Sequence, residues 1–309
     1  MAKPRSGSLD YLCYLGVRVA ACIFLSLPTA FSLWLVRTLA LGIYWADRRH
    51  RNVAIDNLRH SFPGRYTDVQ LRELTRRVYQ HFGMMVLELL LIPRKWRSRR
   101  WRRECEMIPP PEFRKAVSSG RPILIVTAHY GNWELAAIML SAYGVRSHLV
   151  GRPLDNPYLD ALVRRFREST GHKVLSKHGD LARMQAVLKR GGVLCTLADQ
   201  DAGERGIFVD FFGRPASTHK AIAFLAQRAG ALIIVVGTQN MGGLLNYALH
   251  VSDIIDGNDY ARNADALHAI TERITAGVER LVRCDPRQYL WLHRRWKSQP
   301  PPTQVDKAA

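Results

Sequence analysis

The segment PILIVTAHYGNWE, residues 122–134, joins an apolar run to a stretch of catalytic-type residues and indicates the class of fold. A continuous apolar run of this length is typical of a strand that is buried on both faces of a sheet. Gly131 provides a turn after it, and Asn132 is a favourable N-cap for a helix that extends to Tyr143. The segment therefore predicts a strand, a tight turn and a helix, with His129 at the strand end and Glu134 in the first helical turn.

The same alternation of strands and helices continues through the rest of the chain. Further strands are predicted in SHLVGR, KVLS, GVLCTLAD, ALIIVVGTQ and LNYALHVSD, and helices over 67–92, 156–169, 180–189, 218–229 and 261–283. This pattern predicts an α/β fold with a mostly parallel central sheet and helices on both faces. Sites in such sheets form at the carboxyl ends of strands, so we expect His129, Arg152 and the acidic segment 199–201 on one rim.

The N-terminal region is predicted to associate with a membrane. Residues 19–36 carry no charge, between Arg18 and Arg37, and eighteen residues is the lower limit for a spanning helix. We expect residues 11–46 to span the membrane once or to lie deep in one leaflet; the alternative is a helical hairpin buried against the main domain. The arginines that follow this region place the remainder of the chain in the cytoplasm. The predicted divisions are a membrane anchor over 1–46, the main domain over 47–297 and a disordered tail over 298–309.

The charge balance predicts an anionic partner. Lysine and arginine number 45 against 26 acidic residues, a net charge of +19, which would attract nucleic acid, anionic lipid or an acidic carrier protein. The segment RKWRSRRWRR, residues 94–103, suits a membrane surface or nucleic acid, and residues 291–297 repeat its mixture of tryptophan and basic side chains. The five cysteines have neither disulfide-like nor zinc-like spacing, which favours a reducing compartment.

Several common chemistries are disfavoured because their motifs are missing from the sequence. It contains no GxSxG nucleophile elbow, no GxxxxGK[ST] or GxGxxG phosphate-binding loop and no HExxH zinc motif. We expect neither a metal nor a cofactor. His129 and Glu134 remain: a histidine can take a proton from a hydroxyl near neutral pH, and a carboxylate can fix its tautomer. This pair favours acyl transfer from a thioester to an alcohol; the alternative is a structural histidine and a glutamate that complements the helix dipole.

Four segments together resemble a known family. AHYGNWE resembles the H-x-x-x-x-E form of the glycerolipid acyltransferase motif, particularly that of the late acyltransferases of lipid A synthesis (lauroyl and myristoyl transferases), where phenylalanine usually replaces Tyr130. NLRHSFP (57–63), GRPLDNPYLD (151–160) and DQDAGERGIFVDFFGRPAST (199–218) are similar to that family and occur in the same order. The resemblance extends from the N-terminal anchor to Trp296. It implies transfer of a fatty acyl chain from acyl-carrier protein to a hydroxyl of a Kdo-bearing lipid A precursor, at the cytoplasmic face of the inner membrane.

The resemblance also assigns roles to individual residues. It implies His129 as the catalytic base and Glu134 as its partner. An arginine after the GRP segment contributes to the family's site, for which Arg167 is the matching residue and Arg164 its neighbour and competitor.

Three more residues are expected to bind substrate. Arg152 is a candidate for gripping phosphate, because a guanidinium binds it bidentately. Asp199 occupies the place of a glutamate in the phosphate-binding motif of the broader acyltransferase group, although the Glu-Gly-Thr-Arg string of that motif is absent. Asn132 lies at the helix start, whose amides would stabilise an oxyanion. Phe211 and Phe212 belong to an apolar turn that lies near the acyl chain or packs in the core.

Two other functions are compatible with parts of the sequence. One is acylation of another glycolipid, such as a phosphatidylinositol mannoside, and acyl-CoA is an alternative donor. The other is non-enzymatic nucleic-acid binding, which would account for the charge but not for the anchor or the polar strand ends. We therefore expect a membrane surface, an acyl donor and an anionic glycolipid as partners, and no nucleic acid.

Overall fold

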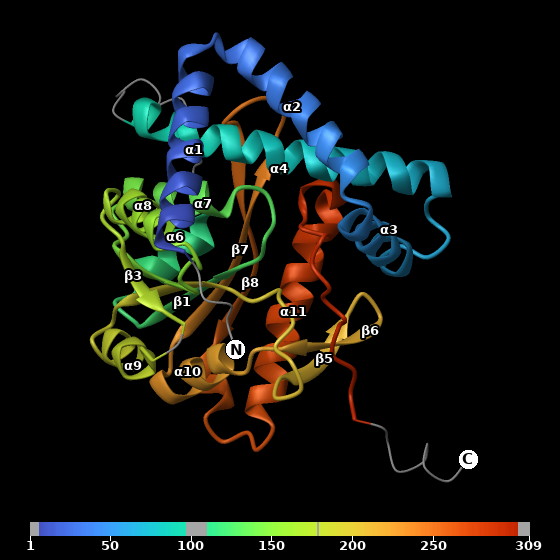
Figure 1. Ribbon diagram of the computed structural model, residues 1–309. Coiled ribbons are helices and arrows are strands. Elements are labelled where there is room, and N and C mark those ends of the chain that lie inside the picture. Colours follow the sequence, from blue (N-terminus) through green and yellow to red (C-terminus); the bar gives the residue numbers. More distant parts are fainter. Residues whose placement is uncertain (1–5, 97–109, 178, 302–309) are drawn as a thin grey trace.

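A computed structural model describes residues 6–96, 110–177 and 179–301 (Figure 1). The basic segment 94–103, predicted to contact a membrane surface or nucleic acid, lies outside the residues whose side chains are described. Most of the predicted tail, residues 302–309, also lies outside them.

A six-stranded sheet forms the centre of the molecule and confirms the predicted α/β class. Its order is β3-β2-β4-β1-β7-β8, with β1 (Ile123–Thr127), β2 (Ser147–Gly151), β3 (Lys173–Ser176), β4 (Val193–Leu197), β7 (Leu232–Asn240) and β8 (Tyr247–Asp256). The first five strands are parallel, and β8 pairs antiparallel with β7. Every residue of β1 is buried, as its apolar run predicts for a strand between two others.

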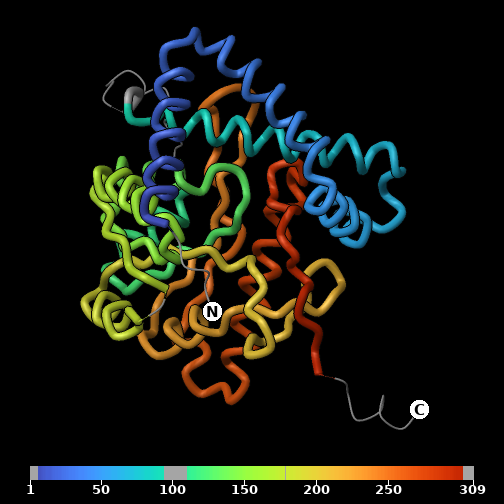
Figure 2. The backbone as a smooth tube through the Cα atoms, in the orientation of Figure 1, coloured from blue at the N-terminus to red at the C-terminus, as the bar shows by residue number. Residues whose placement is uncertain are grey.

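Helices cover both faces of the sheet, also as predicted (Figure 2). Leu124 and Val126 of β1 belong to one core with residues of α9 (Leu181–Lys189), α10 (Ala221–Ala229) and α11 (Ala266–Cys284). Ile123 and Ile125 point to the other face, where they pack with α6 (Pro111–Val117) and α7 (Trp133–Ala142). The alternation follows from the twofold side-chain period of a strand. The remaining helix of the α/β region, α8 (Pro157–Glu168), lies between β2 and β3 in the chain.

A hairpin between β4 and α10 was not predicted from the sequence. It consists of β5 (Ile207–Phe211) and β6 (Arg214–Thr218), so the predicted helix start at Thr218 is wrong and α10 begins at Ala221. Phe212 and Gly213 form its turn with positive φ angles of 57° and 75°. Phe211 and Phe212 are buried against Trp291 and Trp296. Of the two expected positions for these phenylalanines, the core is therefore the one observed.

The N-terminal region forms four helices: α1 (Gly7–Ser26), α2 (Thr29–Ala46), α3 (Arg48–Ser61) and α4 (Asp68–Trp96). The uncharged run 19–36 is divided between α1 and α2, because Pro28 cannot continue a helix. α1 lies beside α8, and α2 lies over α4 (Figure 1). Only 6% and 22% of their apolar windows are buried, which is less than a buried hairpin requires; by length and composition alone either helix could cross a membrane.

Candidate active site

The turn after β1 is fixed by close backbone contacts. Gly131 has φ +60°, and a Cβ at this position would lie 1.4 Å from the carbonyl oxygen of Thr238 on β7. Its N–H donates a 2.9 Å hydrogen bond to the carbonyl of Gln288, in the 3-10 helix η2 (Pro286–Gln288). The predicted glycine turn is thus confirmed, and only glycine combines this φ with this approach.

His129 is held by Asp199, a carboxylate of the neighbouring strand end. β1 and β4 are parallel and adjacent, with Thr127 opposite Leu197, so the residues two positions beyond each strand meet. The backbone N–H of His129 donates to Oδ2 of Asp199 at 2.8 Å, and its ring Nδ1 lies 2.9 Å from Oδ1. With Nδ1 as the donor, Nε2 remains as the basic nitrogen of the ring.

Burial and charge shift the pKa values of His129 and Asp199 in opposite directions. The side chain of Asp199 is 3% exposed and that of His129 is 17% exposed. Burial alone would lower the pKa of His129, but the charge and hydrogen bond of Asp199, with the charge of Glu134, raise it above its ordinary value. Burial would likewise raise the pKa of Asp199, and the interactions with His129 lower it instead. The site therefore stabilises an imidazolium that forms at His129.

Glu134 contacts a different residue from the one expected. Its carboxylate accepts two hydrogen bonds from Arg167: Nε donates to Oε2 at 3.0 Å, and the terminal Nη2 donates to Oε1. The two side chains are only 11% and 24% exposed. The partner that contacts the His129 ring is thus Asp199 and not Glu134, which joins α7 to α8. Catalytic roles for Glu134 and Arg167 stay predictions.

Asn132 caps α7 from a buried position. Its Oδ1 accepts from the N–H of Leu135 at 2.9 Å, and its Nδ2 donates to Oε2 of Glu88 on α4 at 2.8 Å. Glu88 is fully buried, and burial raises the pKa of its carboxyl; it also accepts hydrogen bonds from Tyr247 and the N–H of Leu245, each at 2.7 Å. Asn132 is 0% exposed, so its side chain supports the turn and does not face a ligand. Sequence reasoning missed Glu88, although an acidic residue within the apolar run VLELLLI was a signal for it.

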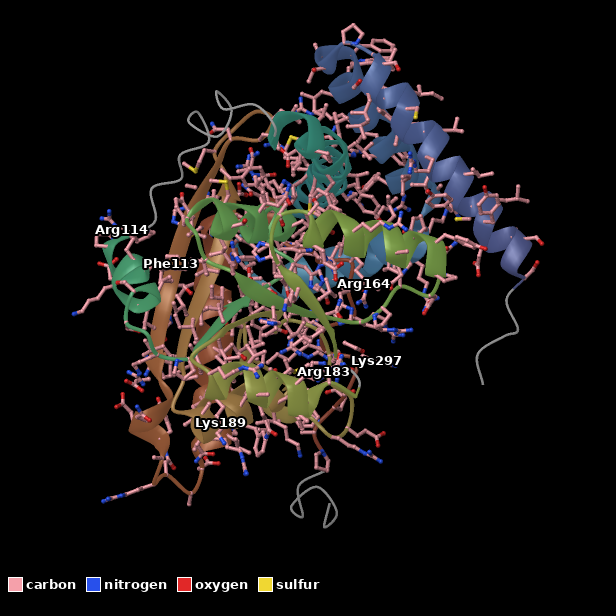
Figure 3. All side chains as sticks on the ribbon, turned by 90° about the vertical axis from the view of Figure 1, so that its left-hand side faces the viewer. Phe113, Arg114, Arg164, Arg183, Lys189 and Lys297 are labelled. Atoms are coloured by element: carbon pink, nitrogen blue, oxygen red, sulfur yellow. The ribbon has the colours of Figure 1, made fainter. Side chains whose placement is uncertain are left out.

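The three arginines predicted to bind substrate line one small cleft. Arg152, Arg164 and Arg167 surround a volume of about 50 Å³ at the carboxyl ends of β2 and β3. Arg152 is mostly exposed and pairs with Asp155 at 2.9 Å. Arg164 is exposed on α8, on the side of the molecule that Figure 3 presents. The structure therefore brings these three residues together, with Arg167 connecting the cleft to Glu134.

The C-terminal segment 291–297 is largely buried, so the sequence-based prediction of a basic surface there is wrong. Trp291, Arg295 and Trp296 are 1%, 2% and 6% exposed, so residues 291–297 do not form a basic surface like that predicted for 94–103. Arg295 donates 2.5 Å hydrogen bonds to the carbonyl of Ser217 and to Oγ1 of Thr218. These contacts satisfy Nη1 and Nη2 of the buried guanidinium, whereas its Nε has no partner within the described residues.

Asp201, the second acid of the predicted rim, binds this segment instead of His129. Its N–H donates to Nε2 of His293 at 3.1 Å, and its carboxylate accepts from the hydroxyl of Ser298 at 3.1 Å. The hydroxyl-bearing ring of Tyr289 is buried beside Asp199, and burial followed by the charge of Asp199 raises its pKa. Within residues 6–96, 110–177 and 179–301, no three histidine, cysteine or acidic side chains gather in a group that could hold a metal ion.

The amino-acid sequence of the chain matches those of known proteins. Residues 3–298 match the sequence profile of the bacterial lipid A biosynthesis acyltransferases. The lipid A biosynthesis lauroyltransferase of Escherichia coli (strain K12) is 28% identical over 82% of this chain and 81% of its own length. The palmitoleoyltransferase of the same strain is 23% identical over 82% and 80%. A phosphatidylinositol mannoside acyltransferase of Mycobacterium tuberculosis (strain ATCC 25618 / H37Rv) is 29% identical, but over only 38% of this chain and 39% of its own.

Proposed function

The chain belongs to the bacterial lipid A biosynthesis acyltransferase family, and we propose that it transfers a fatty acyl chain from the thioester of acyl-carrier protein to a hydroxyl of a lipid A precursor. It is an O-acyltransferase, as the named relatives are acyltransferases. The observation that carries the mechanism is the hydrogen bond between Nδ1 of His129 and Asp199. It fixes the tautomer in which the second ring nitrogen is free to accept a proton.

In the proposed reaction, Nε2 of His129 removes the proton of the acceptor hydroxyl. The alkoxide oxygen attacks the thioester carbonyl, the tetrahedral intermediate collapses, and the carbon–sulfur bond breaks. The leaving thiolate takes the proton back from His129, so that the enzyme is regenerated and the products are an ester and a thiol. Asp199 stabilises the imidazolium throughout. α7 begins at Trp133, whose ring centroid lies 4.8 Å from that of His129, so the positive end of this helix adjoins the reacting atoms.

Glu134 and Arg167 are proposed to position the substrate beside this pair. Arg167 is permanently charged, and its Nε and Nη2 donate to Glu134. Arg167 also lines the cleft together with Arg152 and Arg164. A phosphate of the acceptor would meet three guanidinium groups there. Asp199 is thereby moved from the phosphate-binding role implied by the resemblance to the positioning of His129.

Membrane association is proposed to rest on α1 and α2. Large apolar side chains stay exposed on both helices, among them Leu12 and Val19 on α1 and Trp34 and Ile43 on α2. A bilayer would cover them more favourably than water does. We propose that residues 1–46 form this anchor and that residues 47–297 form the acyltransferase domain on the cytoplasmic face of the inner membrane. The tail proposed over 298–309 begins with a contact, the hydrogen bond of Ser298 to Asp201.

One assay tests the reaction and its rivals together. The purified full-length protein would be given labelled acyl-carrier protein or acyl-CoA and a panel of acceptors: a lipid A precursor, a phosphatidylinositol mannoside and a neutral glycolipid. We expect mass spectrometry to find the acyl ester on the lipid A precursor, faster with the carrier protein, and to find almost none with His129→Ala. Transfer only to the mannoside would contradict the proposed acceptor, and transfer by folded His129→Ala at the normal rate would contradict the mechanism.

A further inference from the structure

A polar cavity of about 490 Å³ lies apart from the residues assigned to acyl transfer. It is bounded by α2, α4, the turn between β7 and β8, and η2; Figure 1 shows α4 crossing the ends of β7 and β8 beneath α2. Its wall includes Arg37, Arg77, Arg287 and the amide side chains of Gln80 and Gln239. This volume is typical of a ligand site and admits a phosphate with an attached sugar or glycerol.

The cavity wall carries an excess of positive charge. Three guanidinium groups face one carboxylate, that of Asp285, which leaves +2 on the wall. His81 adds no charge, because burial lowers its pKa. Arg287 is paired with Asp285 by two hydrogen bonds of 2.7 Å. Arg77 is paired with Glu73, a carboxylate outside the wall that it shares with Arg76. The remaining charge is that of Arg37, and it favours an anion.

Donor groups without acceptors converge on this space. Among the residues that the structure describes, the side chains of Arg37, Gln80 and Gln239 have no hydrogen-bond or ion-pair partner, and they come from α2, α4 and β7. Gln80 and Gln239 are partly buried, and Arg37 is exposed. Partly buried donors are normally satisfied by protein, water or ligand, and an exposed guanidinium is available to a ligand that displaces its water. A group with several acceptor oxygens and negative charge, such as phosphate, would satisfy all three.

An apolar groove of about 390 Å³ continues from the cavity along α2. It shares Arg37 and Gln80 with the cavity, and its own wall includes Leu33, Trp34 and Leu41. Trp34 is 58% exposed on the helix proposed to enter the membrane, one turn from Arg37. A cationic cavity beside an apolar groove matches a phosphorylated lipid, which has an anionic head and a hydrocarbon chain. A soluble phosphate compound has no hydrocarbon chain to fill the groove.

We propose that the cavity binds the phosphate monoester of a membrane lipid, with a hydrocarbon chain of that lipid in the groove along α2. A monoester presents more charge and more free oxygens than a phosphodiester, which matches the three donor side chains that have no partner within the described protein. This binding goes beyond acyl transfer and does not require that the lipid be the acyl acceptor.

The test measures binding of short-chain phosphatidic acid, the monoester probe, to the full-length protein in neutral detergent micelles. Phosphatidylglycerol in the same micelles is the phosphodiester control. We expect tighter binding of phosphatidic acid, and Arg37→Gln should weaken it by about tenfold, as is typical of a charge-assisted contact. Arg49→Gln removes the same charge from an exposed position on α3 outside the cavity and should change binding by less than about twofold. Gln239→Leu, on the opposite wall, should weaken it by about threefold to tenfold.

Each other outcome would overturn the assignment. Equal affinity for the two lipids, or equal losses in Arg37→Gln and Arg49→Gln, would mean attraction by the general surface charge. Displacement of the lipid by inorganic phosphate at similar affinity would mean a soluble ligand. If Arg37→Gln unfolds the protein, unchanged binding in folded Gln239→Leu rejects the site. His129→Ala should lose transfer and keep phosphatidic acid binding, so failure of the proposed reaction and failure of this site are separable.

Discussion

Replacing Asp199 by asparagine should impair the enzyme more than replacing it by alanine. The reason lies in the two hydrogen bonds that Asp199 accepts, from the backbone N–H of His129 at 2.8 Å and from ring Nδ1 at 2.9 Å. In Asp199→Asn the backbone N–H selects the amide oxygen, so the NH₂ group faces Nδ1. It can donate only if Nδ1 is unprotonated, which places the ring proton on Nε2. The imidazole is then held in the tautomer that cannot act as a base.

The expected losses of kcat differ between Asp199→Ala and Asp199→Asn. Asp199→Ala removes both hydrogen bonds; loss of the charge-assisted one to the ring, worth about 1.5–3 kcal/mol, should reduce kcat by about 10- to 150-fold. Asp199→Asn adds the wrong tautomer and should approach the full loss of general-base assistance, about 10²–10⁴-fold. Steady-state acyl transfer, measured beside thermal melts, gives both numbers.

The pH profile provides a second readout of the same change. His129 must be neutral to act as a base, and Asp199 raises its pKa, so activity in the native enzyme is lost as pH falls through that raised value. Without the carboxylate the pKa of His129 falls, and the acidic limb in Asp199→Ala should move to lower pH. The pKa of Asp199 is depressed, so the stability from its ionised form is present above its ordinary pKa of about 3.8 and is lost as pH falls through the depressed folded value.

The control is Asp201→Asn, which changes an acid two residues away that contacts Ser298 and not His129. It should leave the acidic limb in place. Equal losses in Asp199→Asn and Asp199→Ala with unchanged pH profiles would refute the tautomer reasoning and leave Asp199 as a structural residue.

Three further predictions concern the turn, the buried arginine and the N-terminal helices. Gly131→Ala should destabilise the protein by about 3 kcal/mol or more in urea unfolding, because the new Cβ would lie 1.4 Å from a backbone oxygen; Gly64→Ala, with a similar φ of +69° and open space around it, should cost only about 1–2 kcal/mol. Arg167→Lys should lose more than about tenfold in activity, nearly as much as Arg167→Ala, because lysine cannot donate the paired hydrogen bonds that Glu134 accepts; full activity would contradict this. A protein lacking residues 1–46 should be released from membranes by high salt while the full chain is not, which a sedimentation assay decides.

Local features of the site could be predicted from the sequence, because their determinants lie close together in the chain. The apolar run before His129, the turn at Gly131 and the N-cap at Asn132 are each set by residues within about one helical turn of one another. The structure confirms all three. The start of α4 is equally local: it is a capping box in which the N–H of Thr67 donates to the side chain of Gln70 at 2.8 Å.

The strand ends placed His129 and residues 199–201 on one rim, but the hydrogen-bonded pairing of His129 with Asp199 could not be predicted in this way. Asp199 reaches His129 only because β4 inserts between β2 and β1, after two strands and three helices of intervening chain. No periodicity reveals that order. The β5–β6 hairpin escaped notice because its apolar side chains pack on tryptophans from the distant C-terminal segment. The same cause explains why those tryptophans were predicted to lie on the surface. They are buried by the β5–β6 hairpin, and the sequence around them does not contain that hairpin.

The two ionic pairs of the site differ in the proton chemistry that they permit. Arg167 cannot lose its proton near neutral pH, so its pair with Glu134 has a fixed charge, whereas His129 can exchange a proton there. Glu134 acts on His129 only through its field, and Arg167 offsets part of that field. Glu134→Gln would leave the arginine charge unpaired beside the imidazole, so the acidic limb of the pH profile should move to lower pH, but by less than in Asp199→Ala. A larger shift in Glu134→Gln would mean that Glu134 contacts the ring during catalysis, in an arrangement different from this one.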